Sequence, residues 1–410
     1  MFRDRNAPSK VATVFQFADD AFKKGVTFVE PDMECFELGL EAMSKRVNFQ
    51  EVGELVDQIL NVMKKDRYMI PTTKCYASAI AAWKNVAMGR ECDDRELAAF
   101  RTHDLLQEMV RAYHQTTIVK IQPSTQNYND ALEALTMSKN RRAFQRAETL
   151  LKTLEENLDL ADEEIRDDDG MVDDDSESPV ELFPTADSYK HALTVLKNSG
   201  SHNKVREGLL LVQRLESHID HLRKVSTEKA LVDAMSEFIA VCAREVSKHE
   251  RQNMETMFTA LRTMEGIRAL SLTPNAETYA SLLEACDTLV HSSQDRLRIL
   301  ENIFERACTE GYVDHAVLGN FKKAATTYLY GKLVVAPSEV VENVKVVPES
   351  WTRNVEGFST NMQGGRKVLP LSIEGQFTFT KAAAEHKMRR LRKQANKRML
   401  EGGRIRRRRK

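Results

Sequence analysis

The sequence predicts an all-α protein, an α-solenoid in which about six helical hairpins stack one on the next. Three observations predict this fold: a helix-start signal recurs, an amphipathic segment follows each signal, and 410 residues are long for one compact core. A stacked array can reach this length because each unit contacts only its neighbours. In each signal an aromatic residue lies five positions after a proline: Pro31 and Phe36, Pro71 and Tyr76, Pro123 and Tyr128, Pro184 and Tyr189, Pro274 and Tyr279.

Each signal marks the end of one element and the start of a helix. Proline disfavours helical backbone in the residue before it, so the preceding element stops there. The next residue is polar and can accept a hydrogen bond from the unpaired N–H groups of a first helical turn. These predicted N-caps are Asp32, Thr72, Ser124, Thr185 and Asn275. Each aromatic has an aliphatic residue four positions later, which places the aromatic in the core between helices.

A second amphipathic helix completes each hairpin, for example at 52–63, 105–113 and 143–154. The interval from Pro184 to Pro274 has room for another unit, and 226–238 keeps the apolar spacing without the proline and the aromatic. The predicted units therefore start near residues 31, 71, 123, 184, 226 and 274, within an array that spans 1–330.

The array has expected interruptions and ends. Residues 159–181 are rich in Asp and poor in apolar residues, which predicts a disordered acidic insert. Helices are expected at 297–309 and, last, at 313–330. Residues 8–30 resemble the second helix of a unit whose first helix would precede Met1, so we expect that upstream sequence is missing.

The C-terminal part differs in amino-acid composition from the repeats. Residues 331–380 contain three prolines and a β-type run at 341–347, which predicts an irregular segment. Trp351 is expected to pack there against the last repeat. Residues 381–410 favour helix and hold 14 Lys and Arg against two Glu, although the whole chain has a net charge of -1. We therefore predict a basic helical tail on an otherwise acidic protein.

Several classes of protein are not expected. The six cysteines have no CxxC pair, which argues for reduced thiols rather than disulfides or zinc. No apolar run approaches the ~20 residues of a membrane span, and no signal or transit peptide is evident. The chain lacks the common hydrolase, phosphate-loop, Rossmann and deaminase motifs, so we expect no enzyme, no cofactor and no small-molecule substrate. His218 and His221 lack a third metal ligand, and the Asp173–Asp175 run lacks a surrounding fold to hold a metal.

The proline, polar cap, aromatic and paired helices resemble the pentatricopeptide repeat over about residues 8–330, although these units are longer and irregular. The resemblance implies a helical superhelix that binds single-stranded RNA on its concave face, one base per repeat. It also implies a mitochondrial or chloroplast protein. Two positions in that family read a base: the residue after the aromatic and the residue after the next unit's proline.

Transferred to this chain, the base-reading pairs are Glu37 with Thr72, Ala77 with Ser124, Asn129 with Thr185, and Lys190 with a partner near Ser226. Only Asn129 is of the type that the family prefers. The position two before the aromatic, which usually holds an aliphatic residue, is Glu34, Lys74, Gln126, Asp187 or Glu277. Acidic residues here disfavour RNA because carboxylates repel phosphate. The predicted RNA-binding residues of the repeats are Thr72, Ser124, Asn129, Thr185 and Lys190.

The tail is the stronger electrostatic signal for nucleic acid, since neutralised phosphates release counterions. Its alternatives are a nuclear address, a solvated helix face and a patch for anionic membranes. Its predicted RNA-binding residues are Arg389, Arg390, Arg392, Lys393, Lys397, Arg398, Arg406, Arg407 and Arg408. Two functions follow. The first is a non-catalytic organellar protein that binds single-stranded RNA or rRNA and acts in its stability, processing or translation. The alternative is a helical scaffold, such as a ribosome-associated or assembly factor, that holds a protein in its groove and contacts rRNA through the tail.

Overall fold

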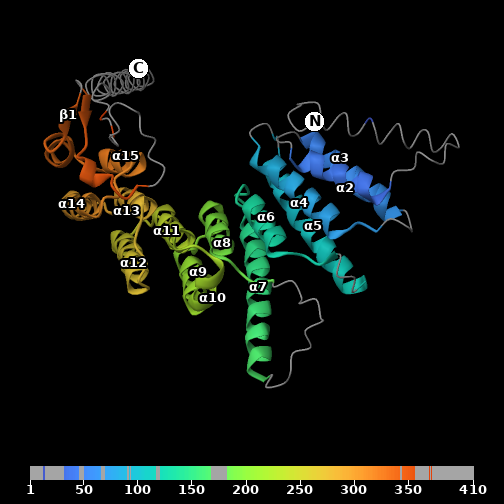
Figure 1. Cartoon of the computed structure of the whole chain (residues 1–410). Coiled ribbons are helices and arrows are strands. Elements are labelled where there is room, and N and C mark those ends of the chain that lie inside the picture. Colours follow the sequence, from blue (N-terminus) through green and yellow to red (C-terminus); the bar gives the residue numbers. More distant parts are fainter. Residues whose placement is uncertain are drawn as a thin grey trace, which may run out of the picture. The chain divides into compact units, whose positions relative to one another are not determined.

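The computed structural model describes residues 13, 32–45, 50–65, 70–89, 92, 94–116, 121–167, 182–341, 344–355, 369 and 371. Two compact units divide the chain, with the boundary after Ile303. The described part of the first unit is helical throughout, which confirms the all-α class (Figure 1). The basic tail at 381–410 and most of the acidic insert lie outside the described residues.

The first unit contains two kinds of helix, which we call A and B. The A helices are the ones that begin at the proline signals or, for α11, near 226; they are α2 (Met33–Ser44), α4 (Thr73–Met88), α6 (Thr125–Leu135), α8 (Ala186–Asn198), α11 (Glu228–Arg244) and α13 (Ala276–Leu289). The B helices that follow them are α3 (Gln50–Lys65), α5 (Arg95–Thr116), α7 (Arg141–Asp167), α9 (Lys204–Ser217) and α12 (Glu250–Ala269). A short helix, α10 (Ile219–Val225), comes directly after α9, and α14 (Ser293–Glu310) crosses the boundary between the units.

Helix contacts in the first unit recur from one hairpin to the next. Each A helix packs on the next A helix, in the order α2, α4, α6, α8, α11 and α13. Each B helix packs against the A helix before it and the A helix after it. The result is a helical repeat-like architecture, in which α11 occupies the position of an A helix although its sequence has neither the proline nor the aromatic.

The aromatic of each signal is a core residue, as the helical spacing requires. Phe36, Tyr76, Tyr128, Tyr189 and Tyr279 are all buried. Trp83 is also buried, and its indole N–H donates to the Asp57 carboxylate on α3 at 3.2 Å. None of the six cysteines, all within the described residues, forms a disulfide.

Helix α7 is longer than the sequence indicated. It continues through Asp167, so the first part of the expected acidic insert, from 159, is helical. The reason is that its apolar stripe extends to the buried Leu158 and is followed by good helix formers. Residues 168–181 lie outside the described residues.

The second unit starts within α14. It contains two shorter helices where the sequence predicted a single helix at 313–330. Its described elements are α15 (His315–Ala324), α16 (Thr327–Tyr330), a π-helical turn (Gly331–Val335), the antiparallel strands β1 (Glu339–Val341) and β2 (Val344–Val346), and a 3-10 turn (Glu349–Trp351). The expected single helix is wrong because Asp314 and Thr326 each cap a separate helix through their side chains.

Trp351 packs where the sequence indicated, within the second unit. Its ring lies edge-on to Phe304, with ring centroids 5.7 Å apart, and Phe304 stacks on Phe321 at 4.0 Å. The Trp351 carbonyl accepts a hydrogen bond from the Val313 N–H at 2.8 Å. The Asn354 side chain donates to the Glu310 carbonyl at 2.8 Å. This segment therefore supplies a hydrogen-bond donor to a carbonyl at the C-terminus of α14, which has no partner within the helix.

Candidate functional site

The A helices are positioned by their N-caps. The Asp32 carboxylate accepts from the Cys35 N–H at 2.9 Å, and Thr72 caps α4 in the same manner. Ser124, Thr185 and Asn275 each form a reciprocal capping box with the third residue of the helix. These caps fix where each A helix starts, and therefore which of its side chains meet the neighbouring A helix.

The predicted base-reading residues Asn129 and Thr185 lie together between α6 and α8. The Asn129 side-chain amide donates to the Thr185 hydroxyl at 3.1 Å, and its oxygen accepts from the Ser188 hydroxyl at 2.6 Å. The predicted base-reading pair Glu37 and Thr72 is also hydrogen-bonded internally: the Thr72 hydroxyl donates to the Glu37 carboxylate at 2.6 Å. These groups therefore hydrogen-bond with one another from neighbouring A helices.

Lys190 does not meet a partner near Ser226. Its ammonium instead lies 3.4 Å from the Asp233 carboxylate on α11 and 4.0 Å from the Glu277 carboxylate on α13. The Ser226 hydroxyl accepts a hydrogen bond from the Ala186 N–H at 3.0 Å. The remaining predicted residue, Ser124, is engaged as a cap, and Ala77 offers it no polar group.

Ion pairs link α2 with α4, α4 with α6, α8 with α11 and α13, and α11 with α13, and we call this set the A-helix ladder. Lys74, Lys84 and Lys190 each contact two carboxylates within 4.0 Å. Lys197 and Arg244 contact one each. The ladder consists of Glu37, Glu41, Lys74, Lys84, Asp130, Glu133, Lys190, Lys197, Asp233, Glu237, Arg244, Glu277 and Glu284.

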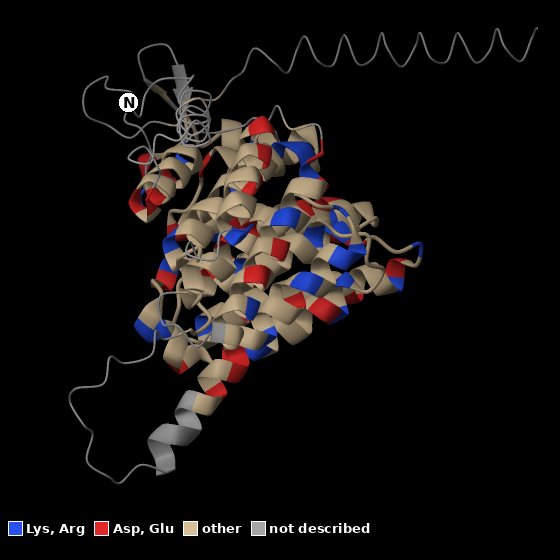
Figure 2. Cartoon of the chain, turned by 90° about the vertical axis from the view of Figure 1, so that its right-hand side faces the viewer, with Lys and Arg blue, Asp and Glu red and all other residues tan. Residues whose placement is uncertain are grey.

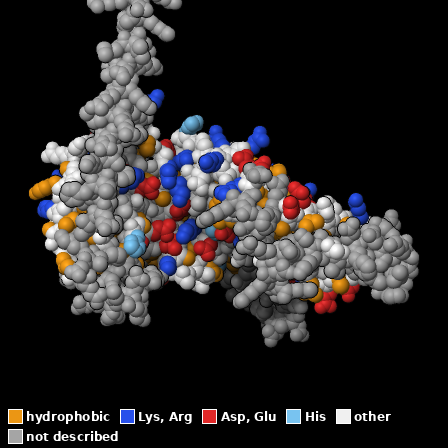
Figure 3. Space-filling model, turned by 90° about the horizontal axis from the view of Figure 1, so that it is seen from above, with side chains coloured by type: hydrophobic (Ala, Val, Ile, Leu, Met, Phe, Trp, Pro, Cys, Tyr) orange, Lys and Arg blue, Asp and Glu red, His pale blue; other side chains and the backbone are white. Residues whose placement is uncertain are grey.

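The ladder has more carboxylates than cations, so its lysines are neutralised and a negative charge remains. Acidic and basic positions are interspersed along the described helices (Figure 2), and acidic and basic side chains lie next to one another in the space-filling view (Figure 3). Such a surface attracts RNA phosphates poorly, because the cations that would release counterions are already paired.

The pKa shifts on the ladder follow from this crowding. Burial opposes the charged form of Lys84, but hydrogen bonds to Asp130 and Glu133 and their charges outweigh it and raise the Lys84 pKa. Partial burial, helped by the charges of Asp233 and Glu237, raises the pKa of Glu277 in spite of Lys190. The raised Lys84 pKa thus reflects its two carboxylate partners, whereas the raised Glu277 pKa comes mainly from burial.

Sequence reasoning found Lys190 but missed most of the ladder. Lys84 and Lys197 each lie eight residues after the aromatic of their unit, and Asp130 lies two after the aromatic of the unit that follows Lys84. These offsets from the aromatic were the sequence signal that could have predicted the ion pairs. They show which charges meet only after the register between neighbouring A helices is known.

The predicted tail residues Arg389, Arg390, Arg392, Lys393, Lys397, Arg398, Arg406, Arg407 and Arg408 lie outside the described residues. Within the described ranges no group of three or more His, Cys, Asp or Glu is placed to hold a metal ion. No described helix is long and apolar enough to cross a membrane. No protein-family model matches the chain, and no curated protein matches it either.

Proposed function

We propose that this chain is a non-catalytic RNA-binding protein whose affinity for RNA comes from the basic residues of 381–410. The observation that carries this proposal is the ladder: its lysines are paired with carboxylates, so phosphate neutralisation has to come from cations elsewhere. Residues 381–410 supply 14 Lys and Arg against two Glu. A segment of this kind binds RNA without reading its sequence.

The recurring helix contacts support the further proposal that the first unit is an α-solenoid of hairpins similar to pentatricopeptide repeats. In that arrangement the array would hold and orient an RNA that the tail attracts. By resemblance, we propose an RNA in a mitochondrion or chloroplast, single-stranded RNA or rRNA, and a role in its stability, processing or translation.

Base reading is proposed at one place only, the Asn129–Thr185 pair, with Lys190 beside it on α8. An incoming base would have to replace the internal hydrogen bonds of Asn129 to Thr185 and Ser188. Each of those bonds contributes about 1 kcal/mol, so a base that offers two equivalent bonds can exchange with them. The expected discrimination between bases is therefore weak.

A quantitative RNA-binding measurement tests this function. The affinities of random and pyrimidine-rich single strands are compared for the full chain, for a variant with the nine predicted tail residues changed to Gln, and for Asn129→Ala with Lys190→Ala. We expect the tail variant to lose most binding to both strands. The double substitution should alter only the preference between strands. Undiminished binding by the tail variant would contradict the proposal.

The excess of carboxylates on the ladder favours a second candidate, a scaffold that binds a basic protein segment on its A helices and contacts rRNA through the tail. The same variants separate the two candidates. A scaffold predicts that RNA binding is insensitive to Asn129→Ala with Lys190→Ala, whereas the RNA reader predicts a changed preference between the two strands.

A further inference from the structure

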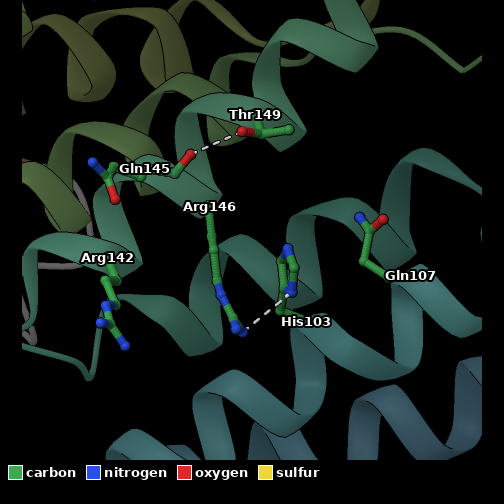
Figure 4. A pocket seen from close by; sticks show the side chains of 6 residues that line it. All are labelled: His103, Gln107, Arg142, Gln145, Arg146 and Thr149. Atoms are coloured by element: carbon green, nitrogen blue, oxygen red, sulfur yellow. Dashed lines mark hydrogen bonds between the residues drawn. The ribbon is translucent and has the colours of Figure 1, made fainter.

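A solvent-open cavity of about 420 Å³ lies between the B helices α5 and α7, and none of its lining residues belongs to the A-helix ladder. Its lining consists of His103, Gln107, Arg142, Gln145, Arg146 and Thr149 (Figure 4). None of these side chains is a carboxylate, in a protein with 61 Asp and Glu. The volume is within the ~300–1,000 Å³ of small-ligand pockets.

Arg142 supplies an unpaired cation at this cavity. Arg101 pairs with Asp57 and Glu108, and Arg214 pairs with Glu155. The guanidinium of Arg142, by contrast, makes no hydrogen bond or ion pair within the part of the chain that the structure describes. Its five N–H donors are therefore available to a ligand.

Arg146 is held in place at the same cavity. Its guanidinium lies over the Phe100 ring, 4.5 Å from the centroid, and donates to the Asp104 carboxylate at 3.0 Å. Arg142 and Arg146 leave α7 one turn apart and extend in the same direction (Figure 4). One fixed and one unpaired guanidinium thus share one side of the cavity.

Helix α5 supplies neutral groups on the other side. Nδ1 of His103 lies 3.2 Å from the Asp104 carboxylate and 3.4 Å from an Arg146 nitrogen, which orients the ring. Its other ring nitrogen points away from Arg146, and the Gln107 amide lies beside it (Figure 4). Burial lowers the pKa of His103, and Asp104 pairs with Arg146, so Arg142 carries the unpaired positive charge of the site.

We propose that this cavity binds a phosphate group, with Arg142 and Arg146 as charged donors and His103 and Gln107 as neutral partners. Phosphate fits because its oxygens can accept from the planar fork of an arginine and from donors on a second helix at the same time. None of the lining residues belongs to the ladder or to 381–410, so this proposal does not rest on the proposed role of 381–410.

Titration calorimetry of the full-length protein with AMP, inorganic phosphate and adenosine tests the proposal. We expect AMP and phosphate to bind and adenosine not to bind. Arg142→Gln should weaken AMP binding about tenfold, the usual effect of losing a charge-assisted hydrogen bond. The matched control is Arg141→Gln, which removes the same charge from an exposed neighbour outside the cavity lining and should change the affinity less than about twofold.

Three results would overturn the site: no binding of AMP or phosphate, equal binding of adenosine, or equal effects of Arg142→Gln and Arg141→Gln. Circular dichroism of both variants verifies that each is folded, which is expected because both side chains are exposed. A short single-stranded RNA is added as a competitor to identify the source of the phosphate. If the RNA displaces AMP, the ligand of the cavity is a backbone phosphate of RNA. If AMP stays bound, the ligand is a free phosphate ester.

Discussion

Glu155 of α7 and Arg214 of α9 form an ion pair that Tyr189 of α8 also contacts. The Arg214 Nε–H lies 3.0 and 2.9 Å from the two carboxylate oxygens, and a second guanidinium nitrogen also contacts Glu155. The Tyr189 hydroxyl donates to the same carboxylate at 2.7 Å. The repeated aromatic of α8 thus joins the two B helices around it, and burial beside this carboxylate raises the Tyr189 pKa.

Breaking this pair from one side should be costly. Arg214→Leu leaves the buried Glu155 carboxylate with Tyr189 alone, and we expect a loss of about 3–5 kcal/mol in the free energy of unfolding. Glu148→Gln is the matched control, because Glu148 is more exposed and lies 4.0 Å from Arg214; it should cost less than about 1 kcal/mol. Urea denaturation measures both. Equal losses would show that the burial of Glu155 is unimportant.

Gly53 allows α3 to approach α4 closely. A Cβ atom built at this position would lie 2.7 Å from the Trp83 ring, and the indole is held by its hydrogen bond to Asp57. Gly53→Ala should therefore destabilise the protein by about 1–3 kcal/mol.

Gly266→Ala in α12 is the control for that substitution, because its Cβ would have only ordinary contacts, the nearest at 3.8 Å. It should be neutral or stabilise by up to about 1 kcal/mol, since alanine favours helix. Thermal unfolding should show a lowered Tm for Gly53→Ala and an unchanged or raised Tm for Gly266→Ala. A stable Gly53→Ala protein would mean that α3 and α4 are not so closely packed.

The cap of α6 should contribute measurably to stability. Ser124 accepts from the Asn127 N–H, and its own N–H donates to the Asn127 side chain at 3.0 Å. Ser124→Ala should cost about 1 kcal/mol. Asn203→Ala, at the N-cap of α9, should cost clearly less, because the Asn203 side chain makes no capping hydrogen bond. Chemical denaturation that gave the reverse order would refute the assignment of the cap.

Glu108 should make stability depend on pH. Partial burial opposes its ionisation, but hydrogen bonds and charges of Lys64 and Arg101 outweigh burial and hold the Glu108 pKa below its ordinary value. A lowered carboxyl pKa contributes stability above the unfolded value of about 4.3, and this contribution is lost as the pH falls through the folded value. Glu108→Gln should therefore destabilise at pH 7, with a difference from the unsubstituted protein that shrinks below about pH 4.3.

Glu96, on the same helix, accepts a hydrogen bond from the neutral Asn140 side chain at 2.9 Å and provides the control for the pH series. Unfolding free energies of Glu108→Gln and Glu96→Gln are compared from pH 7 down to about pH 2.5, so that the series passes through the unfolded and the lowered folded pKa of Glu108. A difference for Glu108→Gln that stayed constant over this range would refute its link to ionisation.

The helix starts were predictable because they depend on local chemistry. Ser124 and Thr185 cap their helices through residues three positions away, so short-range sequence suffices. The ladder was not predictable in this way: Lys84 meets Asp130 only because of the register between α4 and α6. The break at Thr326 was missed because the apolar spacing continues through it, and the cap becomes decisive only once Leu329 is packed.

The most direct test of the central claim is the salt dependence of RNA binding by the full chain. Each phosphate that the protein neutralises on a single strand contributes about -0.7 to the slope of log affinity against log salt. Arg389, Arg390, Arg392 and Lys393 are changed to Gln in one variant, and the exposed Lys152, Lys248, Arg251 and Arg262 of the first unit in the matched control. We predict that the tail variant flattens the slope by about 0.7 for every phosphate that it no longer neutralises and that the control keeps the original slope. An unchanged slope in the tail variant, or an equal change in both, would contradict the claim that the tail supplies the affinity for RNA.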